Sequence, residues 1–306
     1  MTDSLPSVVF PDASPLLLNA LEYLGNPIEE LVVHHGPTDE PTLVERLQGH
    51  VIAINNESYF TRSVVEQCPD LRMILFLGSG ASSFVDMAAC AEHGIAVHSI
   101  PGYGDRTVAE HTIGLLFAVY RDIARQHRVM ADGGWGGAPI GELRGKTIGL
   151  VGFGGIGRET AHIALALGMN VLVSSRRAVE DDRIRLVDLD GLLADADIVS
   201  LHLALTPETA GILDASRLRR MKRGAVLINS ARAALLDEEE LTAMLTDGHL
   251  AGAALDVYSM EPLPASHIFR TVPNLVLTAH TGWQSPEAIH RLVSRAVDIV
   301  QAERRR

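Results

Sequence analysis

The stretch Lys146-Thr-Ile-Gly-Leu-Val-Gly152-Phe-Gly154-Gly155-Ile156-Gly157-Arg158 decides the fold of this chain. Its aliphatic residues are typical of a buried strand that ends on Gly152, and an apolar helical pattern follows. Gly152 permits a tight turn, Gly154 lets a pyrophosphate approach the backbone, and Gly157 lets the helix pack closely on the strand. A G-x-G-x-x-G motif between a strand and a helix therefore predicts a dinucleotide-binding site.

A glycine-rich surface loop is the alternative interpretation of the same residues. The strand before the motif and the helix after it favour the dinucleotide site. The first N–H groups of that helix, at Gly155 and Ile156, would meet the phosphates, because a helix N-terminus carries unpaired donors and a partial positive charge.

Length and composition limit the classes of protein to consider. The chain has 306 residues, which is room for roughly two domains. Hydrophobic residues make up 47% and charged residues 21%, which is ordinary for a soluble globular protein. The net charge is -12, and no dense basic run precedes Arg304-Arg305-Arg306. Nucleic acid is therefore not expected as a partner, because phosphate binding needs a basic face.

Cysteine usage and the apolar runs bear on location. Cys68 and Cys90 are too few for a disulfide framework and predict reduced thiols in a cytoplasmic protein. The first residues show no basic region followed by an apolar run, so no signal peptide is expected. No apolar run reaches ~18 residues, so no membrane span is expected. No metal site is predicted.

Short apolar runs alternate with helical patterns along the chain, which indicates βαβ units and parallel sheets. In the first hundred residues the predicted strands are 30–33, 51–54, 72–77 and 95–98, and the predicted helices are 41–48, 61–68 and 84–93. In the second half the predicted strands are 147–151, 170–174, 198–201, 225–228, 251–255 and 275–278. Six such strands match a doubly wound dinucleotide fold.

The domain boundaries follow from two features. Pro101-Gly102-Tyr-Gly104 breaks the chain, and a final helix, 286–304, comes after the last strand of the second unit. We predict two α/β domains: a discontinuous substrate domain of residues 1–101 and 285–306, and a dinucleotide-binding domain of residues 102–284. In fold terms, a Rossmann cofactor domain is inserted into a flavodoxin-like substrate domain.

Three polar side chains follow buried strands of the second half: Arg232, Glu261 and His280. An arginine can clamp a carboxylate bidentately, and a histidine beside a carboxylate can exchange protons near neutral pH. Singly, each could be a solvated or structural residue. Together, at the ends of successive strands, they predict a catalytic centre at the nicotinamide.

Seven segments of the chain together form a more specific pattern than the glycine motif alone. They are the glycine motif, Val108-Ala-Glu-His111, Leu201-His-Leu-Ala-Leu-Thr206-Pro-Glu-Thr, Asn229-Ser-Ala-Arg232, Leu235-Leu-Asp-Glu-Glu-Glu-Leu241, Asp256-Val-Tyr-Ser-Met-Glu261-Pro-Leu-Pro and Thr278-Ala-His280. Through these segments the chain resembles the D-isomer-specific 2-hydroxyacid dehydrogenases over nearly its whole length. A long helix, 107–130, and the linker around Trp135 also resemble the dimer arm of that family, so we expect a homodimer.

The resemblance implies a role for each candidate residue. Arg232 would hold the substrate's carboxylate and carbonyl, His280 would protonate the carbonyl oxygen, and Glu261 would orient His280. The remaining implied contacts are the backbone N–H groups of Ser79 and Gly80 to the carboxylate, Asp256 to the nicotinamide amide, and Thr206 and Ala231 near the cofactor.

Departures from the family pattern concern loop shape and substrate size. Ala204 and Ala279 stand where prolines are usual, and Ala233 replaces a glycine. The loop 80–86 is one residue longer than the common form. Trp283 beside His280 would narrow the pocket and favour small acids such as glyoxylate, hydroxypyruvate or pyruvate.

Two other functions fit the same resemblance. One is a corepressor-like protein that senses the dinucleotide, although long tails and a basic patch are not seen. The other is a dehydrogenase of another small anion. Formate is disfavoured because formate dehydrogenases carry glutamine where Glu261 stands, and phosphite stays as an alternative.

The residues after the second strand of the cofactor domain predict which nicotinamide cofactor is used. In NAD enzymes an acidic residue ~20 residues after the glycine loop binds the ribose and repels a 2′-phosphate. Ser175 stands at the position where the family's NAD enzymes have Asp, and Arg176 and Arg177, whose guanidinium groups suit phosphate, follow it. We therefore predict a preference for NADP(H). If both arginines point to solvent, NAD would be used as well.

Overall fold

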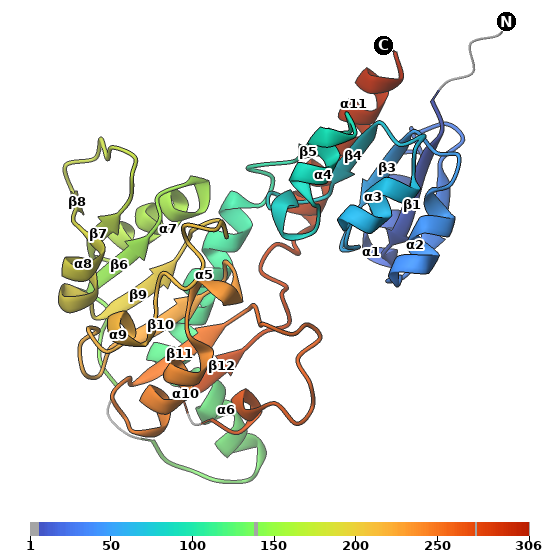
Figure 1. Cartoon of the computed structure of the whole chain (residues 1–306). Coiled ribbons are helices and arrows are strands. Elements are labelled where there is room, and N and C mark those ends of the chain that lie inside the picture. Colours follow the sequence, from blue (N-terminus) through green and yellow to red (C-terminus); the bar gives the residue numbers. More distant parts are fainter. Residues whose placement is uncertain (1–5, 138–139, 273, 306) are drawn as a thin grey trace, which may run out of the picture. The chain divides into compact units, whose positions relative to one another are not determined.

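The computed structural model describes residues 6–137, 140–272 and 274–305 (Figure 1). The chain forms two compact units, Met1–Gly104 with Ser285–Arg306, and Asp105–Gln284. Residues 1–5 and 306 of the predicted substrate domain, and 138–139 and 273 of the predicted dinucleotide-binding domain, lie outside the described residues.

The first unit is built on a five-stranded parallel sheet, in the order β2-β1-β3-β4-β5. This is the flavodoxin-like order, as predicted. The strands are β1 (Val8–Ala13), β2 (Val32–His35), β3 (Ile52–Asn55), β4 (Met73–Phe76) and β5 (Ala96–Ser99).

Strand β1 and the helix after it, α1 (Pro15–Tyr23), are not among the elements predicted from the sequence. Pro11 lies inside β1, and a proline usually argues against a central strand. Here the register shifts between Phe10 and Ala13, so the strand accommodates the proline at an irregularity of the ladder.

The other helices of this unit are α2 (Glu40–Leu47), α3 (Arg62–Gln67), the 3-10 turn η1 (Ala81–Ser83), α4 (Met87–Glu92) and α11 (Pro286–Arg304). The helix predicted from Phe84 begins at Met87 instead, because the side chain of Asp86 accepts a hydrogen bond from Ala89 N and caps it there. Helix α11 is tied to its own unit by the Nε group of Arg291, which donates to Tyr103 O at 2.7 Å.

The second unit contains a seven-stranded parallel sheet in the order β12-β11-β10-β9-β6-β7-β8 (Figure 1). The strand order reverses between β6 and β9, as in a Rossmann fold, and ligands bind outside the carboxyl ends of strands at such a switch point. The strands are β6 (Thr147–Val151), β7 (Asn170–Ser174), β8 (Ile184–Leu186), β9 (Ile198–Leu201), β10 (Val226–Asn229), β11 (Gly252–Leu255) and β12 (Leu275–Leu277).

Six of these strands are predicted from the sequence, and β8 is not. It has three residues and pairs with β7, so its sequence carries little alternation from which to recognise it. The helices of the unit are α5 (Asp105–Tyr120), α6 (Ile123–Ala131), α7 (Gly155–Ala166), α8 (Leu189–Asp195), α9 (Ala215–Leu218) and α10 (Glu238–Thr246), with 3-10 turns η2 (Ala233–Leu235) and η3 (Ile268–Arg270).

The single helix predicted over 107–130 is wrong, because the structure divides it into α5 and α6. Asp122 between them has a left-handed φ of 56°, a conformation that aspartate tolerates better than most residues. Helix α5 is buried along one face. Helix α6 has no buried residue, and Ile123 and Met130 are each 52% exposed. Trp135, in the linker after α6, is 90% exposed.

In the part of the chain that the structure describes, no helix combines the length and the apolar character needed to cross a bilayer.

Candidate active site

The glycine loop joins β6 to α7 with a geometry that only glycine permits. Gly152 has a φ of +103°, and a Cβ on it would lie 2.7 Å from the carbonyl oxygen of His202. A Cβ on Gly157 would lie 2.6 Å from Gly152 O, so strand and helix are in direct backbone contact. At Gly154, by contrast, a Cβ would meet nothing within 4 Å. The loop therefore leaves open space at Gly154 beside the N-terminus of α7.

Gly155 and Ile156 form the first turn of α7, where N–H groups lack helical partners. The carboxylate of Asp105 lies over Gly155, because a Cβ on Gly155 would be 1.6 Å from Asp105 Oδ2. The open space at Gly154, beside the N-terminus of α7, fits a dinucleotide pyrophosphate.

Ser175 follows β7 and organises the turn that carries the two arginines. Its Oγ accepts a hydrogen bond from Arg177 N at 2.9 Å, and both arginines are exposed. Glu208, two residues from the predicted cofactor residue Thr206, lies within electrostatic range of this turn. The hydroxyl of Thr206 donates to Glu208 at 2.7 Å and lowers the pKa of that carboxyl, with a smaller contribution from Arg176.

His280 and Glu261 form the central pair of the site. His280 Nδ1 lies 2.7 Å from Glu261 Oε2, and Glu261 Oε1 accepts from Tyr258 N at 2.8 Å. Burial raises the pKa of Glu261, but the hydrogen bond and charge of His280 outweigh it and leave the pKa lowered. Because Nδ1 is engaged, Nε2 is the ring nitrogen that remains for proton transfer.

Arg232 is presented by a loop that the side chain of Asn229 holds at the end of β10. Asn229 is 1% exposed, and its amide accepts from Ala231 N at 3.0 Å and donates to Arg232 O at 2.9 Å. The Arg232 guanidinium donates to Ala231 O, and its charge contributes to the lowered pKa of Glu261. The structure thus brings Arg232, Glu261 and His280 together.

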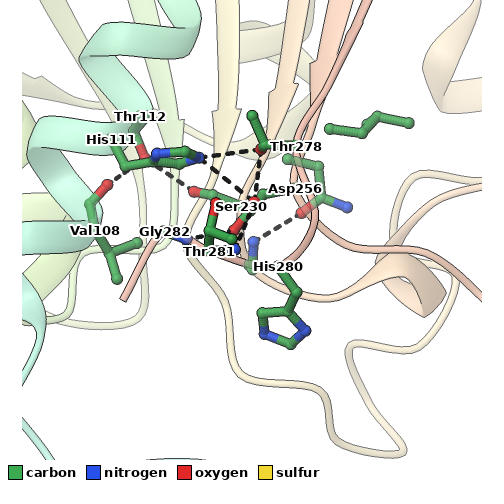
Figure 2. Close-up of polar contacts among 12 residues, drawn as sticks. Val108, His111, Thr112, Ser230, Asp256, Thr278, His280, Thr281 and Gly282 are labelled. Atoms are coloured by element: carbon green, nitrogen blue, oxygen red, sulfur yellow. Dashed lines mark hydrogen bonds and ion pairs between the residues drawn. The ribbon is translucent and has the colours of Figure 1, made fainter. Parts of the chain in front are cut away.

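Asp256 lies at the end of β11, where both of its carboxylate oxygens are occupied by protein donors (Figure 2). It is 1% exposed. Oδ1 accepts from Thr278 Oγ1 at 2.6 Å and from Thr281 N at 3.0 Å, and Oδ2 accepts from Gly282 N at 2.9 Å. Burial raises the pKa of this carboxyl, but the hydrogen bonds, with His111 first among them, leave it lowered.

His111 and Thr278 have no role assigned from the sequence. Both lie within segments that carry the family resemblance, but 167 residues separate them, and only the structure shows their contact. Trp283 follows the same turn and is partly buried.

Ser79 and Gly80 belong to the other unit, in the loop between β4 and η1. The preceding Gly78 is packed on the ring of Phe76, because a Cβ on Gly78 would lie 2.5 Å from it.

The candidate residues of the second unit follow the strand order of its sheet. From one side to the other lie Ser175 after β7, Gly152 after β6, Thr206 after β9, Arg232 after β10, Asp256 after β11 and His280 after β12. Such a row along the carboxyl edge suits an extended ligand with its adenosine end at β7 and its reactive end at β12.

Comparison with known proteins indicates the same family that the sequence resembles. Residues 113–282 match the family described as D-isomer specific 2-hydroxyacid dehydrogenase, NAD binding domain. A glycerate dehydrogenase of Methylorubrum extorquens is 38% identical over 85% of this chain and 84% of its own. A hydroxypyruvate reductase of Blautia hydrogenotrophica is 34% identical over 85% of this chain and 84% of its own.

A solved structure resembles nearly the whole chain. The TT0316 protein from Thermus thermophilus aligns with a TM-score of 0.85 and 36% identity, covering 97% of this chain and 96% of that one.

Proposed function

Since this chain belongs to the D-isomer specific 2-hydroxyacid dehydrogenase family, we propose that it transfers hydride between NADP(H) and a small 2-oxo or 2-hydroxy acid, such as hydroxypyruvate or glyoxylate. The hydrogen-bonded pair of His280 and Glu261, with the charge of Arg232 beside it, is the observation that carries this proposal.

The candidate trio consists of Arg232, Glu261 and His280, and each of these residues has one task in the reduction. The reduced nicotinamide, when bound, supplies the hydride. Arg232 binds the substrate's carboxylate and keeps its carbonyl group in a fixed orientation, since a guanidinium matches a carboxylate bidentately. His280 holds a proton at Nε2 and delivers it to the carbonyl oxygen. Glu261 stabilises the protonated imidazole and fixes its ring.

The remaining contacts complete the proposal. The backbone N–H groups of Ser79 and Gly80 would bind the substrate's carboxylate. Thr206, Ala231 and Asp256 would lie near the cofactor, and Trp283 would limit the size of the substrate. The relatives named for glycerate and hydroxypyruvate support small acids with a hydroxymethyl tail.

A preference for NADP(H) over NAD(H) is supported by the turn after β7. Ser175 carries no negative charge that would repel a 2′-phosphate, and the exposed arginines at 176 and 177 can approach one. A charge-assisted hydrogen bond is worth ~1.5–3 kcal/mol, so we expect ~10–150-fold higher catalytic efficiency with NADPH. Arg176→Ala should weaken NADPH and leave NADH nearly unchanged, with Arg223→Ala as a control for the loss of one surface arginine.

A homodimer is the proposed assembly. Helix α6 has no buried residue, while Ile123, Met130 and Trp135 expose large apolar side chains on or beside it. A second copy would cover them. Light scattering should give twice the mass of the chain, and Trp135→Lys should shift it toward the monomer. A monomer at micromolar concentration for the native protein would contradict this.

The test of the function is a spectrophotometric screen of glyoxylate, hydroxypyruvate, pyruvate and phosphite with each nicotinamide cofactor in the appropriate direction. We expect the highest efficiency for a 2-oxo acid with NADPH. Binding of the dinucleotide without turnover of any acid would favour the corepressor-like alternative, and turnover of phosphite alone would favour the other one. The assembled His280–Glu261 pair favours the enzyme, because a sensor needs no proton donor.

A further inference from the structure

His280 is held in an uncommon backbone conformation. Its φ is 53°, in the left-handed region that residues other than glycine rarely adopt and that costs on the order of 1 kcal/mol or more. The next two N–H groups, of Thr281 and Gly282, both donate to the carboxylate of Asp256. The buried carboxylate therefore fixes the turn from which the His280 side chain projects (Figure 2).

The proton positions around Asp256 follow from the donors and acceptors present. The carboxylate accepts only, so the hydroxyl of Thr278, 2.6 Å from Asp256 Oδ1, must donate to it. Thr278 Oγ1 can then only accept from His111 Nε2 at 3.1 Å, so Nε2 carries a proton. The same nitrogen lies 3.4 Å from Asp256 Oδ1, and its proton is shared between the two oxygens.

The ring of His111 also supports the turn by contact. A Cβ on Gly282 would lie 3.1 Å from His111 Cδ2 and 2.9 Å from Asp256 Oδ2. The turn is thus packed directly on the imidazole as well as hydrogen-bonded to the carboxylate, and a smaller or loose side chain at 111 would leave space beneath it.

Helix α5 also contacts the loop that carries Arg232, through the residue after His111. Thr112 is fully buried, and its Oγ1 lies 2.8 Å from Ser230 Oγ in the loop that carries Arg232. Two successive residues of one helix therefore contact the two loops that present Arg232 and His280.

We propose that His111 is a positioning residue, which acts through Thr278 and Asp256 to hold the 278–282 turn so that His280 faces the substrate. This inference rests on the proposed function for its kinetic consequence, but the geometry of the turn can be tested without turnover.

The kinetic test compares two substitutions of His111. His111→Leu keeps bulk but cannot donate to Thr278, so kcat should fall about 10–100-fold, since a small displacement of a catalytic group costs that much. KM and cofactor affinity should change less than about threefold, because the interaction that is lost acts on the transition state. His111→Gln retains an N–H donor and should restore most of kcat. His162→Leu, on the exposed face of α7, is the matched control and should keep native kcat.

A double substitution separates positioning of His280 from general loss of structure. In a His280→Ala background, His111→Leu should lower the residual activity no further, because residues that act as a unit are not additive. An equal fall in both backgrounds, or a loss of cofactor binding parallel to the loss of kcat, would overturn the proposal.

Trp283 provides a readout that needs no substrate. The chain has two tryptophans, so Trp135→Phe leaves Trp283, three residues after His280, as the sole tryptophan. In that background His111→Leu should increase acrylamide quenching of Trp283, and His111→Gln should reverse the increase. If quenching responds but no 2-oxo acid is reduced, the proposed function fails while the positioning stands. If the acids are reduced but neither quenching nor kcat responds to His111→Leu, only the positioning fails.

Discussion

The glycine loop and the His280 turn lie at the same carboxyl edge of one sheet but are built in opposite ways. The shape of the loop depends on glycines, which have no side chain: Gly152 and Gly157 allow close backbone contacts, and Gly154 leaves open space. The turn is made by side chains that converge from distant segments, with Asp256 and Thr278 joined by His111 from α5. A cofactor that many enzymes share is bound by a local backbone motif, whereas proton transfer needs a side chain fixed by long-range contacts.

The largest effect is expected at the turn. His280→Ala removes the proposed proton donor, and general acid catalysis is typically worth ~10²–10⁴-fold, so kcat for the best 2-oxo acid should fall by that factor. The dissociation constant of NADPH should change little, because the glycine loop is untouched. Native turnover in this variant would show that the proton comes from another group.

A substitution in the loop should act on the fold first. Gly152→Ala places a Cβ 2.7 Å from the His202 carbonyl oxygen in a residue with φ +103°. Strain of this kind together with overpacking amounts to roughly 2–4 kcal/mol, so denaturant unfolding should report a loss of that size. If Gly152→Ala unfolds at the same denaturant concentration as the native protein, the backbone contact is not a fixed part of the structure.

The same contrast explains what the sequence could predict. The parallel sheets and the glycine loop follow from local patterns, since each depends on residues close together in the chain. Asp122 and Pro11 show the limit within local structure. A left-handed residue ends a helix that the apolar pattern extends, and a register shift accommodates a proline that argues against a strand.

The candidate trio was predictable as three polar residues after buried strands, with their roles taken from the family resemblance. The contacts that hold the turn of His280 in place could not be predicted. Asp256 was assigned to the cofactor, and its contacts with Thr281 and Gly282 depend on the fold of the turn. His111 had no assignment, because a histidine on a helix gives no sign of a partner 167 residues away.

His202 offers a third test, because its backbone lies against the glycine loop. Burial lowers the pKa of its imidazole from 6.5 to about 4, and its Nε2 lies 3.0 Å from Ser200 Oγ. The unfolded chain binds this proton first as pH falls, so stability from this group is present above pH 6.5 and is lost between pH 6.5 and about 4.

The size of that loss is about 2 kcal/mol after allowance for partial exposure, from roughly 1.4 kcal/mol per pKa unit. Denaturant unfolding at pH 7.5 and pH 4.5 should show a steeper decline for the native protein than for His202→Asn, which has no titrating ring. Equal declines in the two proteins would mean that the imidazole takes up its proton without cost in the folded state.

The smallest effect on the fold is expected at Gly154, two residues from the most sensitive position. A Cβ there meets no atom within 4 Å, and the φ of −78° is one that alanine adopts readily. The free energy of unfolding of Gly154→Ala should therefore differ from that of the native protein by no more than about 0.5 kcal/mol. The added methyl group would nevertheless occupy the space through which a pyrophosphate approaches the N-terminus of α7. We therefore expect the dissociation constant of NADPH to rise about tenfold, equivalent to about 1.4 kcal/mol, measured by titration calorimetry.

Gly114→Ala, at an exposed glycine of α5 where a Cβ also meets nothing within 4 Å, is the control and should bind NADPH like the native protein. Gly152→Ala loses stability and Gly154→Ala loses affinity. If Gly154→Ala binds NADPH as tightly as the native protein does, the pyrophosphate does not pass over this part of the loop, and the dinucleotide site would have to be placed elsewhere along the carboxyl edge.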